Sequence, residues 1–201
     1  NLHTDPKFTA NVTAAAAAGL KVGVYHYSGA ISATEAKKEA NYVVNLLKPY
    51  KSKITLPVMF DYEPGERVTA NYKKTTRTKY ATTFCNAAKA AGYTSGVYCS
   101  TSWFPTYFNV SSLSGYSNWD AQWASKNTYT GAYDFWQYSD SGKISGISGN
   151  VDLDYWYGAP LTGTHRHTYQ VTAQTAATCT QPGQTTYTCA CGATKTETTA
   201  A

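Results

Sequence analysis

Two carboxylates separated by one residue have the clearest potential for chemistry in this sequence. Asp61 and Glu63 follow an almost wholly apolar run, residues 54–60. Side chains two positions apart on a strand point to the same face, about 6.5–7 Å apart, so both carboxylates would face one space and Tyr62 would face away. Two carboxylates in different surroundings can have separated pKa values, and one then acts as an acid while the other stays ionised. Glycosidases use such a pair of carboxylic residues.

Other interpretations of the carboxylate pair are a solvated pair at a strand end and a metal site. Two features favour the glycosidase. The pair ends a strand that is expected to be buried, and active sites of β/α barrels lie at the carboxyl ends of their strands. The chain also contains 18 Tyr and 5 Trp. Such rings often line grooves for sugars or peptides, although they also fill cores.

The elements that must position this pair alternate between helix and strand. Glycines close two of the helical stretches, and a capping box opens another. Helices are expected at residues 11–18, 32–47 and 69–91. Strands are expected at residues 22–27, 54–60, 96–99, 119–123, 135–138 and 151–156. The alternation predicts parallel β/α units, and the last three strands are separated by Gly, Ser and Asn instead of helices.

Composition excludes several classes of protein. With 42% hydrophobic residues the chain can build a core, and no apolar run is long enough for a transmembrane helix. The net charge of +5 is spread without a Lys/Arg block, which favours an anionic polymer or surface over nucleic acid. The sequence starts without an initiator Met, a basic n-region or an apolar h-region, so we expect any secretion signal to lie outside the sequence given. We expect no cofactor.

Six short motifs in a fixed order carry a resemblance to a known family. They are GVYHY at 23–27, PVMFDYE at 57–63, GVY at 96–98, WDAQWA at 119–124, DFWQYS at 134–139 and GNVDLD at 149–154. Their order and spacing over about residues 5–158 resemble glycoside hydrolase family 25, the bacterial and phage N-acetylmuramidases called Chalaropsis-type lysozymes.

The resemblance implies an α/β fold, an irregular TIM-like β/α barrel, that hydrolyses the β-1,4 bond between N-acetylmuramic acid and N-acetylglucosamine in peptidoglycan. Glu63 matches the general acid/base of the family and Asp61 its partner carboxylate. The second half of the reaction could be completed by Asp61, by the substrate's own acetamido group or by a water. The substrate-binding residues implied by the match are Asp152, Tyr25, Trp136 and Tyr138.

One departure from the family leaves rival functions open. The family begins with a strand that carries an active-site Asp, which nothing here matches, so we expect a barrel lacking its first two strands, less stable and with little or no activity. A non-catalytic wall-binding module is therefore one alternative. A chitinase-like glycosidase is another, although Pro57 and Met59 stand where that family needs acids.

The composition changes near Leu161. Residues 162–201 contain 14 Thr and resemble Thr-rich repeats of bacterial surface proteins. We expect residues 1–160 to form the lysozyme-like domain. Residues 161–201 are expected to form a small β module that could associate with the cell wall, outside the cell, with a flexible linker as the alternative. A zinc site would use His165 or His167 with Cys179, Cys189 and Cys191. A disulfide is the alternative, and since the C-x-C spacing is imperfect for zinc, we predict no metal.

Two further side chains have alternative interpretations. His26 lies between two Tyr, and a hydrogen-bonded place in the core is favoured over a catalytic role. Cys85 and Cys99 are expected to be buried free thiols, with a disulfide as the alternative.

Overall fold

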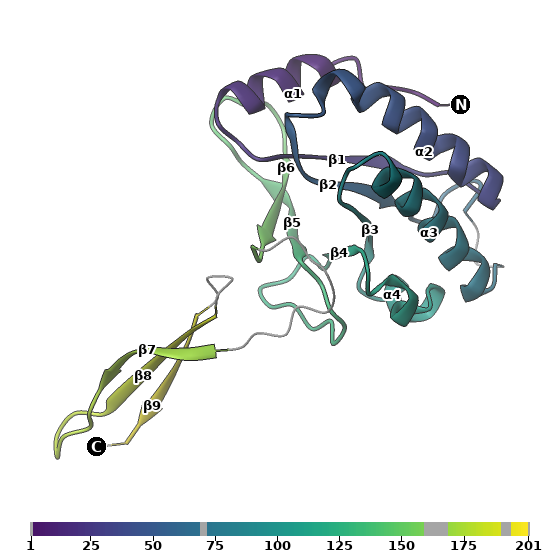
Figure 1. Ribbon diagram of the computed structural model, residues 1–201. Coiled ribbons are helices and arrows are strands. Elements are labelled where there is room, and N and C mark those ends of the chain that lie inside the picture. Colours follow the sequence, from purple (N-terminus) through teal and green to yellow (C-terminus); the bar gives the residue numbers. More distant parts are fainter. Residues whose placement is uncertain (1, 69–71, 159–168, 190–193, 201) are drawn as a thin grey trace. The chain divides into compact units, whose positions relative to one another are not determined.

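The computed structural model describes residues 2–68, 72–158, 169–189 and 194–200 (Figure 1). These residues form two compact units, and the division between them falls near residue 156. The larger unit contains the carboxylate pair. The smaller unit is built from the last three strands.

A curled, mostly parallel sheet of six strands organises the larger unit (Figure 1). The strand order follows the sequence from β1 to β6, and each pair from β1–β2 to β4–β5 is parallel. The strands are β1 (Val22–Tyr27), β2 (Ile54–Asp61), β3 (Ser95–Ser100), β4 (Ser117–Ala121), β5 (Phe135–Gly142) and β6 (Val151–Trp156). The expected α/β class with a TIM-like arrangement of strands is confirmed.

Three helices lie in the first half of the chain, as expected, and a short fourth helix that was not expected follows β3. They are α1 (Phe8–Ala17), α2 (Ala33–Leu47), α3 (Lys74–Ala90) and the short α4 (Trp103–Tyr107). Short 3₁₀ turns follow at Lys48–Tyr50 and Val110–Leu113. The cap expected at Ser32 is formed, because Ser32 Oγ accepts from the backbone N–H of Glu35. Glu35 Oε2 reaches back to the backbone N–H of Ile31, one residue before the cap.

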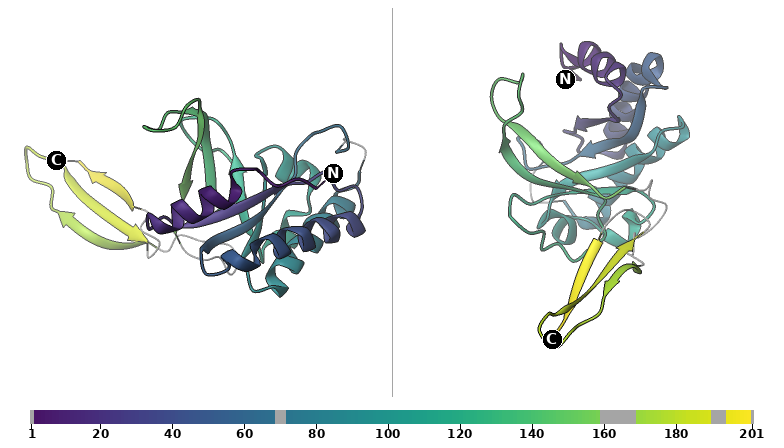
Figure 2. Two further views of the ribbon diagram at one scale, coloured as in Figure 1. Left: turned by 90° about the horizontal axis from the view of Figure 1, so that it is seen from above. Right: turned by 90° about the vertical axis from the view of Figure 1, so that its left-hand side faces the viewer.

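The core between the sheet and the helices α2 and α3 decides which way β2 presents its side chains. Val58, Phe60 and Tyr62 alternate along the chain and are all fully buried in this core. Phe60 packs against Phe84 of α3 with ring centroids 5.1 Å apart. Figure 2 shows β5 and β6 rising on the side of the sheet away from these two helices. Met59, Asp61 and Glu63, which alternate with the core residues, are therefore directed to the face without α2 and α3.

The smaller unit is a three-stranded antiparallel sheet in the order β7–β8–β9. Its strands are β7 (Tyr169–Thr175), β8 (Gly183–Cys189) and β9 (Thr194–Thr199). A small β module was expected here. The proposed metal ligands or disulfide partners His165, His167 and Cys191, and the side chain of Cys189, lie outside the described residues. Cys179 is exposed and free.

Two further observations concern the described residues as a whole. Cys85 and Cys99 are both buried and free, which confirms the expectation of unpaired thiols. None of the helices in the described ranges combines the length and apolar character required to cross a membrane.

Candidate active site

Strand pairing places a row of side chains from β1 to β4 on one face of the sheet. Tyr27 is paired with Asp61, Asp61 with Tyr98, and Tyr98 with Trp119. In parallel strands, paired residues direct their side chains to the same face. The carboxyl end of β2 therefore has aromatic neighbours on both sides.

A cavity of about 160 Å³ lies in front of this row. Its lining residues are Tyr25, Asp61, Glu63, Tyr98, Trp119, Gln137 and Asp152. Four of the predicted site residues thus come together: Asp61, Glu63, Asp152 and Tyr25. A larger cavity of about 600 Å³ extends along α1 and β1, and Tyr25 lines this one as well. Tyr25 thus lies on the border of both cavities.

The two carboxylates of the pair have different surroundings. Asp61 is only 7% exposed, and its Oδ1 is buried without a hydrogen-bond partner in the described residues. Burial, together with the nearby Glu63, raises the pKa of Asp61 to about 8. Glu63 is half-buried, and burial is the main cause that raises its pKa. The nearby Asp152 raises the pKa further, whereas Tyr98 acts in the opposite direction and lowers it. Both groups hold a proton more tightly than an exposed carboxylate does.

Tyr98 and Gln137 are site residues that the sequence analysis did not single out. Tyr98 is buried, and on the sheet it lies between Asp61 and Trp119. Its hydroxyl donates a 2.9 Å hydrogen bond to Gln137 Oε1. Trp123, from the loop after β4, donates its indole N–H to the same oxygen, also at 2.9 Å. Both residues stand within motifs of the family resemblance, GVY at 96–98 and DFWQYS at 134–139, which is the signal that could have found them.

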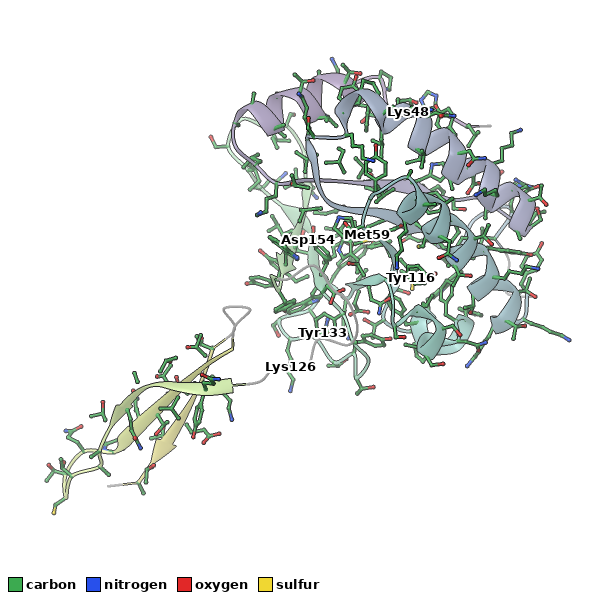
Figure 3. All side chains as sticks on the ribbon, viewed as in Figure 1. Lys48, Met59, Tyr116, Lys126, Tyr133 and Asp154 are labelled. Atoms are coloured by element: carbon green, nitrogen blue, oxygen red, sulfur yellow. The ribbon has the colours of Figure 1, made fainter. Side chains whose placement is uncertain are left out.

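Trp119 forms one wall of the cavity. Its ring packs edge-on against Tyr98, with centroids 4.7 Å apart, and against Tyr25 at 6.4 Å. Its indole N–H donates to Asp154 of β6, whose position Figure 3 shows. Burial is the main cause that raises the pKa of Asp154 to about 6, in spite of this hydrogen bond. Asp154 therefore orients a cavity residue.

Trp136 and Tyr138 do not line this cavity. The Trp136 indole N–H donates to the backbone oxygen of Gln122 at 2.8 Å, and Tyr138 stacks on Tyr155 with centroids 4.6 Å apart. Neighbouring residues of a strand point to opposite faces. Because Gln137 faces the carboxylates, Trp136 and Tyr138 on either side of it face away.

His26 belongs to the core. It lies on the opposite face of β1 from Tyr25 and Tyr27, where its ring stacks on Phe84 at 5.9 Å. Its Nε2 is 3.4 Å from Glu39 Oε2 of α2, and Ser28 Oγ donates to the same carboxylate oxygen at 2.5 Å. The structure supports the core interpretation of this histidine.

The described residues contain no group of three or more His, Cys, Asp or Glu side chains that is arranged to hold a metal ion.

Comparisons with known proteins agree with this geometry. The family model of the glycosyl hydrolases family 25 matches residues 1–147. The chain is 30% identical over 163 residues to an autolytic lysozyme of Clostridium acetobutylicum, and the match covers 80% of this chain and 47% of the lysozyme.

Solved structures share the fold, among them two bacterial lytic enzymes. The modular autolysin LytC of Streptococcus pneumoniae, in complex with a synthetic peptidoglycan ligand, has a TM-score of 0.66 at 27% identity, over 77% of this chain and 38% of LytC. The spore cortex lytic enzyme SleM of Clostridium perfringens has a TM-score of 0.66 at 19% identity, over 94% of this chain and 65% of SleM. The chain spans less than half the length of the matched lysozyme and of LytC.

Proposed function

The chain belongs to the glycosyl hydrolases family 25, and from this premise we propose that it hydrolyses the β-1,4 bond between N-acetylmuramic acid and N-acetylglucosamine in peptidoglycan. The observation that carries the proposal is the placement of Asp61 and Glu63 in one cavity with different degrees of burial. Two carboxylates that hold their protons differently are what glycoside hydrolysis requires.

Glu63 is the proposed general acid. Its pKa is raised, mainly by burial, so a larger fraction of Glu63 carries a proton near neutral pH than of an exposed glutamate. The proton moves to the glycosidic oxygen as the bond to the anomeric carbon breaks, and the leaving sugar departs with a new hydroxyl. The Glu63 carboxylate then takes a proton from the water whose oxygen bonds to the anomeric carbon, which returns the site to its starting state.

Asp61 is the proposed partner carboxyl. With a pKa of about 8 it holds a proton at neutral pH in the free protein. A protonated carboxyl donates a hydrogen bond, and once a positively charged sugar forms nearby the ionised form becomes favoured. Both properties suit a group that orients the substrate's 2-acetamido group and then stabilises the developing charge.

The lining of the cavity supports a revised set of substrate contacts. Asp152 and Tyr25 keep the substrate-binding role expected from the sequence, because they line the cavity. Trp119 joins them, since its ring offers an apolar face beside the carboxylates. Trp136 and Tyr138 are assigned to packing on the other face of β5.

The proposed place of action is the bacterial cell wall, outside the cell. The relatives are named as a lysozyme and an autolysin, and the autolysin LytC was solved with a synthetic peptidoglycan ligand. The net charge of +5 suits an anionic glycan wall. The β7–β9 unit is proposed to add wall affinity.

The test is the release of reducing ends from purified peptidoglycan. Glu63→Gln should lower turnover by roughly 10²–10⁴-fold, the usual contribution of a general acid. Glu66→Gln is the matched control, because Glu66 is an exposed neighbour, and should leave turnover unchanged. Equal turnover by Glu63→Gln and wild type would remove Glu63 from the mechanism.

A binding assay separates the rival functions. Insoluble peptidoglycan should retain the protein, and soluble chitin fragments should compete poorly. Equal competition by chitin would favour a chitinase-like glycosidase. Retention without any release of reducing ends would favour a non-catalytic wall-binding module.

A further inference from the structure

The cavity in front of the carboxylates is too small to enclose the substrate of the proposed function. Its volume is about 160 Å³, whereas pockets that enclose a whole small-molecule ligand measure roughly 300–1,000 Å³. A glycan strand that is cut between two sugars has at least one ring on each side of the cleaved bond. Part of the glycan therefore has to lie on the surface beside the cavity.

Trp123 offers such a surface next to the cavity. It belongs to the loop after β4, and its indole N–H donates at 2.9 Å to Oε1 of Gln137, which lines the cavity. Trp123 is nevertheless 61% exposed and does not belong to the hydrophobic core. Since its N–H already has an acceptor, Trp123 presents mainly the apolar body of its ring to the outside.

The loop that carries Trp123 is closed on itself and tied to the sheet. Gln122 Oε1 accepts the backbone N–H of Thr128, and Gln122 Nε2 donates to the Thr128 hydroxyl, both at 2.7 Å. Asn127 Nδ2 donates at 2.9 Å to Oδ2 of Asp120, which is fully buried on β4. A side chain that is fixed before the ligand arrives loses less conformational entropy on binding. Trp123 is therefore preorganised as a binding surface.

Exposed rings stand on both sides of the strand that carries the carboxylates. Tyr25 of β1 lines the cavity and is 65% exposed. Trp123 follows β4, and in the strand order β1–β2–β3–β4 the strands β1 and β4 lie on opposite sides of β2. A glycan that crosses the carboxylates along this direction meets Tyr25 on one side and Trp123 on the other.

We propose that Trp123 is the stacking platform for a sugar ring that lies outside the cavity, and that it makes the protein select glycans longer than a disaccharide. A pyranose ring carries C–H groups on its faces, which pack against an aromatic face, while its hydroxyls stay in water at the rim. The inference rests on the proposed function, because it concerns the substrate of the same site.

Binding of soluble glycans tests the platform without any need for turnover. The protein carries Glu63→Gln, so that bound glycans stay intact. The probes are peptide-free oligosaccharides of two, four or six alternating N-acetylglucosamine and N-acetylmuramic acid units. In titration calorimetry, Trp123→Ala should weaken the binding of the two longer probes by roughly tenfold, the scale of one ring contact. The shortest probe can be held by the cavity and Tyr25, so its affinity should change much less.

A second variant separates stacking from the support that Trp123 gives to Gln137. Trp123→Phe keeps a ring and removes the N–H, so the platform predicts that it retains most of the affinity that Trp123→Ala loses. Leu20→Ala is the control, because Leu20 is 63% exposed and precedes β1, at the end of the strand away from the carboxylates. Its affinity for every probe should equal that of the parent protein.

Three results would overturn the proposal. They are undiminished binding of the longer probes by Trp123→Ala, equal losses in Trp123→Phe and Trp123→Ala, and equal losses with probes of every length. A parent protein that binds none of the probes overturns the proposed function as well, whereas binding without an effect of Trp123 overturns this inference alone. In the active protein, Trp123→Ala should raise KM for peptidoglycan and change kcat little, the pattern of a contact made equally in the bound state and the transition state.

Discussion

The indole N–H of Trp119 donates a 2.7 Å hydrogen bond to Oδ1 of Asp154. The two residues come from β4 and β6, and only Trp119 lines the cavity with the carboxylates. A hydrogen bond to a charged acceptor is stronger than one between neutral groups. Asp154 therefore holds the Trp119 ring in a fixed orientation against Tyr98.

Loss of this acceptor should weaken the proposed activity without abolishing it. We expect Asp154→Ala to lower kcat/KM by roughly tenfold, the scale of one hydrogen bond to a charged group. Asp154→Asn keeps an acceptor for the indole and should lose less. Kinetics on purified peptidoglycan measure both. Asp140→Ala, at an exposed position of β5, is the control. If the Asn and Ala variants are equally impaired, the hydrogen bond is not what Asp154 contributes.

Asp61 should make the protein less stable as the pH rises. Its pKa is about 8 in the folded protein and 3.8 as an ordinary aspartate. Between these values the folded protein holds a proton that the unfolded chain has released, so the free energy of unfolding decreases as the pH rises through this window. The stability that the protonated Asp61 contributes to the folded protein is fully present below pH about 4 and is lost once the pH has passed about 8.

Asp61→Asn should remove this pH dependence. We expect the variant to match wild type near pH 4 and to melt several degrees higher at pH 8, since each kcal/mol moves the Tm of a chain of this size by about 2–4 °C. Thermal melts from pH 4 to 8 measure the difference. Burial also raises the pKa of Asp134 to about 7. Because Asp134 titrates in wild type and in the variant alike, its effect cancels in the difference between their Tm values. A Tm difference that is the same at every pH contradicts the prediction.

Gly96 should not tolerate a side chain. A Cβ at this position would lie 2.3 Å from the backbone oxygen of Ser117 and 2.7 Å from Met59 Sδ. The first contact is with the backbone of the paired strand β4, which cannot move without opening the sheet beside Tyr98 and Trp119. Gly96→Ala should therefore destabilise the protein by about 1–3 kcal/mol or more and lower activity. Gly115→Ala, where a Cβ meets nothing within 4 Å, is the matched control in thermal melts. Equal melting of the two variants would show that the sheet can adjust.

Arg77 should stabilise the helical side of the unit. It is fully buried on α3, and its guanidinium carbon lies 4.4 Å from the ring centroid of Tyr107 and 5.1 Å from that of Trp103. Cation–π contacts are strongest where water is excluded. We expect Arg77→Ala to cost about 3 kcal/mol, because it also leaves a cavity. Lys79→Ala, at an exposed position of the same helix, should cost little. Chemical denaturation measures both, and similar losses would argue against the aromatic cage.

Much of the local structure could be predicted from the sequence. The cap at Ser32 starts α2, and the alternation of Phe60, Asp61, Tyr62 and Glu63 between two faces was correct. Such features depend on neighbours within a few positions in the chain, through the period of a strand or the first turn of a helix. Boundaries were less accurate, since α3 begins at Lys74 and not near residue 69.

The composition of the cavity depended on the tertiary structure. Tyr98 joins Asp61 because β3 pairs with β2 in one particular register, and a shift by one residue would turn it to the helices. The same rule directs Gln137 to the carboxylates and turns Trp136 and Tyr138 away from this cavity. The sequence motifs had suggested Trp136 and Tyr138, and not Gln137, as substrate-binding residues. Asp154 reaches Trp119 only because the sheet curls. The sequence by itself determined which residues alternate along each strand. Which of the two faces meets the carboxylates was decided by the pairing between strands, because side chains repeat every two residues and a strand considered alone has no preferred face.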